Sequence, residues 1–309
     1  MPDRCEAVVC ILAHNEESNI RRTLRAIIDG NIDAEPVIRV YANGCTDNTH
    51  AVVREMAQQF PQIELIEISR PSKPNAWNRA FADSNEEIII FADADVIPSA
   101  GAISRIIEKF NDHSDMEIVS CESWPDFQAV GWQQKLTGFM QIPVAQDFLI
   151  GHFYGLRRSA FAAHFVALGL DGLPEGIAGE DAFLEGMMTP GKLMLADSKV
   201  KYEPPMLEDY YKYLGRIKWQ NQQISLFNQG NRVKVAGSGQ KNSLVRLAGK
   251  LSSERPISRL ALGVSATAVR MVFKQLKRRR IAHAYQKLGP VTQDGAWVLS
   301  EATRSTSCK

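Results

Sequence analysis

Short apolar runs alternate with amphipathic segments over the first 125 residues of the chain. A nearly all-apolar run predicts a strand buried on both faces at residues 7–13, and further strands are expected at 37–42, 63–68, 88–92 and 117–121. Between them, apolar side chains recur at helical spacing and predict helices over residues 20–30, 47–60, 76–82 and 98–110. Because strands that alternate with helices pair in parallel, we expect a mostly parallel sheet covered by helices, an α/β fold.

The pattern changes after Trp124, where aromatic and Gln-rich stretches begin. Beyond it we expect helices at residues 159–167, 182–188, 207–228 and 255–280, and short strands at 193–195 and 200–202. A glycine-containing loop covers 174–181, 236–242 is a candidate Gly/Ser linker, and the tail after Thr292 is polar. We therefore expect two domains: residues 1–230, and a basic, mainly helical extension over 231–309.

The composition is that of a globular protein, with 45% apolar and 23% charged residues among 309. The N-terminus lacks the pattern of a secretory signal, and no uncharged apolar run approaches the roughly 18–20 residues of a membrane-spanning helix. The five cysteines are scattered, and none pair at metal-binding spacing. Their pattern argues against a zinc site or a disulfide framework and fits a reducing cytoplasm.

The net charge of +1 hides an uneven distribution. Residues 1–200 carry 16 basic and 29 acidic side chains, whereas 201–309 carry 20 and 6. Between residues 212 and 287 there are 17 basic side chains and one acid, Glu254. This asymmetry favours an anionic partner for the basic half, such as a membrane surface or an anionic acceptor.

The predicted helix at 255–280 is both amphipathic and basic. Such helices can lie in the interface of an anionic membrane, although a packed helix with a solvated basic end fits the pattern as well. No nucleic-acid-binding motif is found, so no nucleic acid is expected as a partner. These features predict a cytoplasmic protein or one held peripherally on the inner face of the cell membrane.

Two acids separated by one residue follow the apolar run at 88–92. If the strand ends at Asp93, the chain can turn and present Asp93 and Asp95 to one ligand. Paired carboxylates suit Mg²⁺ or Mn²⁺, which keep other positions for water and phosphate oxygens. The alternative is that both acids are solvated at a strand end and cap the next helix.

Three further polar segments are candidates for chemistry. Glu180 and Asp181 open a predicted helix, where they serve either as simple caps or as a general base at a site. The segment Asn43-Gly44-Cys45-Thr46-Asp47 permits a tight turn after a strand. Lys73 in the segment at 71–80 could approach a phosphate, or lie on an ordinary solvated helix face.

Taken in order, these segments resemble the GT-A fold of family 2 glycosyltransferases. The similarity runs through VVCILAHNEESNIRRTL, NGCTDNT, KPNAWNRA, FADADV, GLRRSAF and GEDAFL, and covers about residues 7–230. The resemblance implies a Rossmann-like mixed sheet and a metal-dependent, inverting transferase that uses a nucleotide-diphosphate sugar. It also implies a donor-binding group made of Ala13, Asn15, Glu16, Asn43, Asp47, Lys73, Asn75, Asp93 and Ala94.

The resemblance assigns the remaining roles as well. Asp93 and Asp95 would bind Mn²⁺ or Mg²⁺, with Asp95 the direct ligand. Asp181 would be the catalytic base, supported by Glu180, and the GLRRSAF stretch would help to form the donor-sugar and acceptor site. The implied partners are the nucleotide-diphosphate sugar and a glycan or lipid-linked acceptor, in polysaccharide or glycolipid synthesis.

The sequence departs from the family pattern at Cys45 and at Pro74, where Ser and Gly are more usual. The segment at 216–223 keeps Trp and Gln but not the Q-x-x-R-W order of processive synthases, which favours transfer of a single sugar. Two alternatives remain. A nucleotidyltransferase would need a Gly-rich, Arg-containing loop after the first strand, and a non-catalytic nucleotide-sugar-binding protein would not need the three aspartates at 93, 95 and 181.

Overall fold

The computed structural model of the chain describes residues 7–31, 36–128, 130–143, 148–230, 235 and 257–286. The chain divides into two compact units, each assembled from several stretches of sequence. The first unit takes Met1–Trp124, Leu149–Gly176 and Met187–Tyr202, and the second takes Pro125–Phe148, Ile177–Gly186 and Glu203–Lys309. The expected linker at 236–242 and the polar tail after Thr292 lie outside the described residues, and the expected domain boundary at residue 230 stays a prediction.

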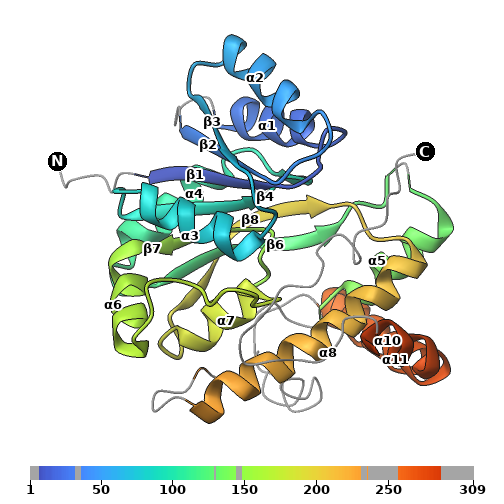
Figure 1. Cartoon of the computed structure of the whole chain (residues 1–309). Coiled ribbons are helices and arrows are strands. Elements are labelled where there is room, and N and C mark those ends of the chain that lie inside the picture. Colours follow the sequence, from blue (N-terminus) through green and yellow to red (C-terminus); the bar gives the residue numbers. More distant parts are fainter. Residues whose placement is uncertain are drawn as a thin grey trace. The chain divides into compact units, whose positions relative to one another are not determined.

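The first unit is built on an eight-stranded sheet with the order β3-β2-β1-β4-β7-β6-β8-β5 (Figure 1). Its strands are β1 (Ala7–Ala13), β2 (Val37–Asn43), β3 (Ile63–Ile68), β4 (Ile88–Asp93), β5 (Val96–Pro98), β6 (Ile118–Pro125), β7 (Phe153–Arg157) and β8 (Leu193–Tyr202). The strands β3, β2, β1 and β4 pair in parallel, as the alternating pattern predicts. On the other side of β4, β7 runs antiparallel to both β4 and β6, so the sheet is mixed.

The sheet contains three features that the apolar pattern did not indicate. The short strand β7 was not expected, and β8 is one continuous strand where two were predicted. The helix expected from residue 98 begins at Ala102 instead, because Pro98 pairs with Val200 as the end of β5. Gly101 then takes a left-handed φ of 74° just before the helix.

Most helices follow the predicted positions, several with shifted ends, whereas α5 was not predicted. In the first unit they are α1 (Ile20–Gly30), α2 (Thr49–Gln59), α3 (Lys73–Asp83), α4 (Ala102–Asp112) and α6 (Arg158–Leu168). In the second they are α5 (Trp132–Gln141), α7 (Glu180–Met187, without its last residue), α8 (Leu207–Gly230), α10 (Ile257–Leu276) and α11 (Arg278–Gln286). No helix within these described stretches is both long enough and apolar enough to cross a membrane.

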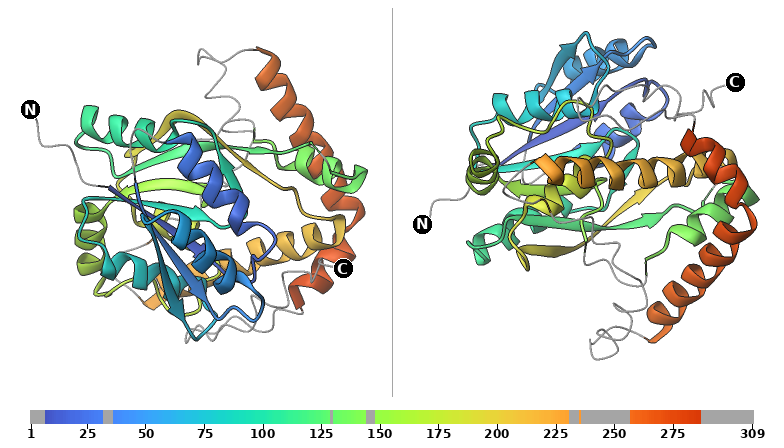
Figure 2. Two further views of the ribbon diagram at one scale, coloured as in Figure 1. Left: turned by 90° about the horizontal axis from the view of Figure 1, so that it is seen from above. Right: turned by 60° about the horizontal axis from the view of Figure 1, so that its bottom comes forward.

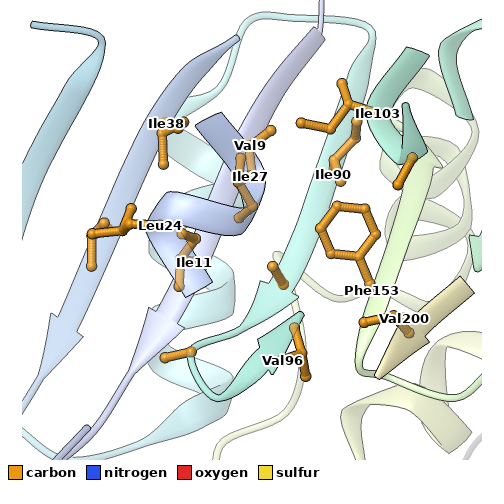
Figure 3. Close-up of a cluster of buried hydrophobic side chains, with 14 of the residues drawn as sticks. Val9, Ile11, Leu24, Ile27, Ile38, Ile90, Val96, Ile103, Phe153 and Val200 are labelled. Atoms are coloured by element: carbon orange, nitrogen blue, oxygen red, sulfur yellow. The ribbon is translucent and has the colours of Figure 1, made fainter. Parts of the chain in front are cut away.

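One face of the sheet packs against α1, α2 and α4 through aliphatic side chains (Figure 3). Alternate strand residues such as Val9, Ile11 and Ile90 meet Leu24 and Ile27 of α1, and all five are fully buried. Seen from above, α1 lies over the parallel strands (Figure 2, left).

The opposite face is held by an aromatic cluster between the sheet, α3 and α6. The Trp77 ring stacks on Phe81 and Phe91 with centroid separations of 5.1 and 4.9 Å. Its Nε1 donates to the Tyr154 hydroxyl at 3.1 Å, so the buried indole keeps its hydrogen bond. The cluster therefore ties α3 to β4 and β7 close to the end of β4.

The second unit is helical, and α8 packs against α5 and α11 while α5 packs against α10 (Figure 2, right). Met140, Tyr210 and Leu214 form its small buried core. The Phe273 ring stacks on Tyr211 with centroids 5.6 Å apart. The helix expected at 255–280 is thus two helices, with a break at Lys277.

Candidate functional site

The carboxyl ends of the parallel strands and the start of α3 meet at one edge of the sheet. Strand register places Leu12 beside Asp93 and Ala13 beside Ala42. In sheets of this kind, ligands bind in the crevice outside the carboxyl ends of the strands. The polar segments singled out in the sequence lie at this edge, apart from those of the second unit.

The Asn43 side chain joins three of the segments at this edge. Its Nδ2 donates to the Ala13 carbonyl at 2.8 Å, and its Oδ1 accepts from the Ser72 amide at 3.1 Å. Its own carbonyl contacts His14 Nδ1 at 2.6 Å. Because the side chain is only 4% exposed and both of its polar atoms are engaged, Asn43 holds the end of β1, the end of β2 and the start of α3 together.

The loop after β1 is held against the turn after β2. Asn15 has a left-handed φ of 55°, which Asn tolerates better than most residues, and its Oδ1 accepts from the Thr46 amide at 2.7 Å. The buried Glu16 donates its amide to Thr49 Oγ1 at 2.8 Å and accepts from Asn19 Nδ2 at 3.0 Å. Asn15 itself is exposed at this edge.

Asp47 receives hydrogen bonds from both loops. Its Oδ1 accepts from the Thr49 amide and hydroxyl at 3.0 and 2.5 Å, and its Oδ2 accepts from the Glu17 amide at 3.0 Å. Partial burial alone would raise the pKa of Asp47, but these hydrogen bonds outweigh it and lower the pKa below its ordinary value. The carboxylate is therefore ionised at neutral pH.

Gly44 permits the turn after β2 to lie close to the segment before α3. It has a φ of 58°, and a Cβ at this position would lie 2.5 Å from the Pro71 nitrogen. Only glycine fits such a contact without moving the backbone.

The acidic pair lies in a tight turn between two strands. β4 ends at Asp93, Ala94 and Asp95 form the turn, and β5 follows at once, as the sequence predicted if the strand ended at Asp93. Ala94 is 2% exposed and packs into the core, where its carbonyl accepts from Thr23 Oγ1 at 2.8 Å. Asp93 donates its amide to the His152 carbonyl at 3.0 Å, and both acids are half-buried.

Lys73 contacts the first acid of the pair. Its Nζ donates to Asp93 Oδ1 at 2.8 Å, and the two side chains are 28% and 20% exposed. Ser72 caps α3 by accepting from the Asn75 amide at 3.3 Å, and Asn75 is exposed in the first turn. The positive end of α3 and the Lys73 ammonium therefore lie beside the acidic turn.

The acidic turn offers hard oxygen ligands but not a complete metal cage. Within the described part of the chain, no group of three or more His, Cys, Asp and Glu side chains could hold a metal ion. Mg²⁺ and Mn²⁺ are commonly bound by one or two carboxylates together with substrate phosphates and water. The donor set of Asp93 and Asp95 fits this mode of binding.

The GLRRSAF stretch lies away from the acidic turn. Register pairs Arg157 with Ile88, at the start of β4, whereas Phe153 pairs with Ala92 beside Asp93. Arg157 donates to the carbonyls of Met116 and Phe110 at 3.0 and 3.1 Å. Arg157 therefore holds backbone near the start of β4, and the expectation that the stretch helps to form a donor-sugar and acceptor site stays a prediction.

Glu180 and Asp181 belong to the second unit and open α7. Glu180 is 8% exposed and Asp181 is half-buried, with its Oδ1 accepting from the Ala182 amide at 2.8 Å. Burial raises the pKa of the Tyr213 hydroxyl, and the negative charge of Asp181 contributes to the rise. Asp181 at the start of α7 thus lies close enough to α8 to influence the pKa of Tyr213.

The segment before α7 is held by glutamines of α8. Gln223 Oε1 accepts from the Ala178 amide at 2.9 Å. A Cβ at Gly179 would lie 2.0 Å from the end of the Gln220 side chain, so a larger residue there would displace this glutamine. The Phe183 and Phe227 rings also meet edge to face, 5.1 Å apart. These contacts position the start of the helix that carries Asp181.

Sequence reasoning placed His14, Ser72 and Gln223 in segments that it singled out but gave none of them an individual role, and each contacts another such segment. Ser72 carried a usable signal, because a serine two residues before a proline is typical of a helix start, and α3 does begin at Lys73 rather than at the expected residue 76. His14 and Gln223 carried none, since their partners are 29 and 45 residues away in the sequence.

A mixed sheet of this order, with an acidic turn at the end of its last parallel strand, defines a GT-A fold, and solved glycosyltransferase structures share it. Residues 8–165 match the family described as Glycosyl transferase family 2, which is half of the chain. The chain therefore belongs to glycosyl transferase family 2.

Two solved structures illustrate the shared fold. One is the mannosyltransferase PcManGT from Pyrobaculum calidifontis, in complex with GDP-Man and Mn²⁺. The match includes 91% of this chain and 74% of PcManGT, with a TM-score of 0.51 and 18% identity. Staphylococcus aureus TarS residues 1–349, in complex with UDP-GlcNAc, also covers 91% and is covered to 89%, with a TM-score of 0.51 and 12% identity. At these identities the likeness concerns the fold alone.

Two curated relatives match part of the chain. The probable glycosyltransferase YdaM of Bacillus subtilis is 32% identical over 104 residues, which are 32% of this chain and 25% of that protein. An uncharacterized glycosyltransferase of Nostoc sp., alr2836, is 26% identical over 103 residues, which are 33% of this chain and 32% of that protein. The matched part thus spans about a quarter to a third of the length of these relatives.

Proposed function

We propose that this protein is a metal-dependent, inverting glycosyltransferase that moves a single sugar from a nucleotide-diphosphate sugar to a hydroxyl acceptor. The observation that carries the proposal is the acidic turn of Asp93 and Asp95 at the carboxyl edge of the parallel strands. It lies in a chain of glycosyl transferase family 2, next to the positive start of α3.

The loops after β1 and β2 provide the proposed nucleotide pocket. The ionised Asp47 can accept hydrogen bonds from the base or the ribose, while Ala13, Asn15 and Glu16 line the pocket. Asn43 keeps the pocket in shape, since its side chain is used within the protein. The similar structures that hold GDP-Man and UDP-GlcNAc support a nucleotide sugar as the donor.

Asp93 and Asp95 would hold Mn²⁺ or Mg²⁺ in the proposed enzyme, with Asp95 as the direct ligand. When bound, the ion would neutralise the charge of the departing nucleoside diphosphate. Lys73, which contacts Asp93 at 2.8 Å, adds positive charge at the same place, and Asn75 lies exposed beside it for the sugar or phosphate. The Mn²⁺ in the PcManGT complex supports this assignment.

Asp181 is the proposed general base. It would take the proton of the acceptor hydroxyl, whose oxygen then attacks the anomeric carbon on the face opposite the leaving group and inverts its configuration. Glu180, buried beside it, supports the position of the base. The acceptor in this proposal is a glycan or lipid-linked hydroxyl, as in polysaccharide or glycolipid synthesis, and peripheral attachment to a membrane would bring the enzyme close to it.

The donor half of the proposal is tested by isothermal calorimetry with UDP and GDP, each with and without Mn²⁺. We expect metal-dependent binding of at least one nucleotide, and we expect Asp95→Ala to weaken it about tenfold or more, because an ionic ligand is lost. The exposed Asp29→Ala is the matched control and should bind as the unmodified protein does. Unchanged affinity in Asp95→Ala would refute the ligand assignment.

The catalytic half is tested with Asp181→Asn in a transfer or hydrolysis assay over a set of nucleotide sugars. Removing a general base typically costs 10²- to 10⁴-fold in rate, so we expect turnover to fall by about that factor. Nucleotide affinity should stay within about twofold, because the donor-binding residues proposed above belong to the other unit. Undiminished turnover would remove Asp181 from its proposed role.

A further inference from the structure

An apolar stripe is exposed along α10. Val269, Val272 and Leu276 are 38%, 59% and 74% exposed. Their spacing of three and four residues places them on one face of the helix. Exposed large apolar side chains that share a face mark an interaction surface more often than isolated ones do.

This stripe is not the face by which α10 joins the second unit. Ala266 is fully buried, and Phe273 packs on Tyr210 and Tyr211 of α8. The helix therefore already buries one apolar face within the unit and exposes a second. A helix that only needed to pack against α8 would not require the second face.

A dense group of cations directly follows the stripe. Lys277, Arg278, Arg279 and Arg280 are all exposed, and residues 257–286 contain no acid. Among the residues that the structure describes, no carboxylate pairs with any of these four cations, although Arg280 lies over the Tyr211 ring at 5.8 Å. Elsewhere several exposed cations pair with acids, as Arg54 does with Glu67 and Arg79 with Asp83.

The break between the two helices forms a hollow among these charges. It is shallow and open to solvent, and the described residues that line it are 275–280, which include the four cations and Leu276. An anionic group that entered the hollow would meet several positive charges without competition from a described carboxylate.

We propose that α10 and α11 dock this protein on the surface of an anionic lipid bilayer. The docking surface consists of Val269, Val272, Leu276, Lys277, Arg278, Arg279 and Arg280. The stripe enters the acyl boundary below the headgroups, while the cations contact lipid phosphates at its end. This is the arrangement of helices that lie in the plane of the membrane interface.

The combination of features distinguishes a bilayer from other occupants. A polyanion such as RNA would neutralise the cations but leave the apolar stripe in water. A second copy of the chain would cover the stripe but bring two groups of cations together. An anionic bilayer offers both apolar depth and negative charge at the distances set by the end of α10 and the start of α11.

Co-sedimentation of the full chain with lipid vesicles tests the proposal. We use vesicles of phosphatidylcholine alone and vesicles with about 30% phosphatidylglycerol, and expect clear binding only to the anionic ones. The charge variant Lys277→Gln/Arg278→Gln/Arg279→Gln should bind about one hundredfold more weakly, because each juxtamembrane cation contributes several-fold. The control variant Arg22→Gln/Arg105→Gln/Lys201→Gln removes three exposed cations elsewhere and should bind as the unmodified chain does.

The apolar half of the surface is tested separately. Val272→Ser/Leu276→Ser should weaken binding to anionic vesicles about tenfold or more, since two side chains no longer enter the acyl boundary. Val166→Ser is its control, because Val166 is 79% exposed on α6 of the other unit. Thermal unfolding of every variant should match the unmodified chain, since all the changed residues are exposed.

Several results would overturn the proposal. Equal binding to neutral and anionic vesicles, or binding to neither, contradicts a role for the cations at a bilayer. A charge variant that loses vesicle binding while the apolar variant keeps it contradicts entry of the stripe into the acyl boundary. A concentration-dependent dimer that the apolar variant abolishes, without vesicle binding, points to a second copy of the chain.

Discussion

At the scale of single residues, Asn43 stabilises the shape of the site, because both polar atoms of its side chain bond within the protein. Its amide satisfies the Ala13 carbonyl and the Ser72 amide at the same time. Asn43→Ala would leave the Ser72 amide without this acceptor and the Ala13 carbonyl with only the Cys45 Sγ contact at 3.6 Å, and an unsatisfied buried group costs about 1–3 kcal/mol. We expect the variant to lose about 2 kcal/mol or more of unfolding free energy, measured by urea denaturation.

The exposed Asn75→Ala is the informative comparison. Its side chain lies in the first turn of α3 and is proposed to face the donor, so we expect stability within about 0.5 kcal/mol of the unmodified chain. Its nucleotide-sugar affinity should nevertheless fall. If Asn43→Ala were as stable as Asn75→Ala, Asn43 would not be the residue that holds the edge together.

The acids proposed to bind the metal and the residue that holds the edge of the sheet together also differ in how far the sequence could predict them. The acidic turn was predictable, because an all-apolar run that stops at Asp93 indicates a buried strand end. The function of Asn43 as a link between three segments was not, because the segments it joins lie about 29 residues away on either side. Local patterns show which residues end a strand, whereas such links depend on the register of strands that are distant in sequence.

At the scale of elements, α8 positions α7. Gln223 accepts from the Ala178 amide two residues before α7 begins. Gln223→Leu keeps much of the side-chain volume but removes this acceptor, so the start of α7 and Asp181 should lose their fixed position. We expect kcat to fall about tenfold or more, because small displacements of catalytic groups are costly.

The measurement that distinguishes this positioning effect from general damage is the separation of kcat from nucleotide affinity. Donor affinity should change less than about twofold in Gln223→Leu, as the proposed donor residues lie in the other unit. Ser225→Ala, exposed on the same helix, should leave both quantities unchanged. Equal losses of kcat and of donor affinity would contradict the positioning role.

The elements themselves were predicted best where the sequence pattern is local. β1, β3 and α1 match the predicted ranges because their apolar periodicity is strong. β7 was missed because FYGLR alternates weakly and contains Gly155, whose missing side chain makes room for Ile106 and Phe110. The antiparallel pairing of β7 with β4 depends on contacts between segments that are distant in sequence, and no local pattern of this chain indicates it.

At the scale of the whole molecule, the charge division of the sequence takes on a structural meaning. Several exposed cations of the first unit pair with acids, as in Arg54–Glu67, Arg70–Glu175 and Arg79–Asp83. The described cations at 277–280 have no such partners. The excess of positive charge is therefore available to an external anion in the second unit, whereas the acidic excess of the first 200 residues includes the proposed metal pair.

If the two units bind different partners, amide hydrogen exchange should report two separate protected regions. Mn²⁺ with the nucleotide that binds should slow exchange in the loops after β1, β2 and β4 and at the first turn of α3, because bound ligand stabilises the folded state there. Anionic vesicles should instead slow exchange over residues 265–286. Asp95→Ala should remove the first effect only, and Lys277→Gln/Arg278→Gln/Arg279→Gln the second only. Protection by nucleotide that is confined to α10 and α11, or vesicle protection confined to the strand ends, would contradict this assignment of partners to units.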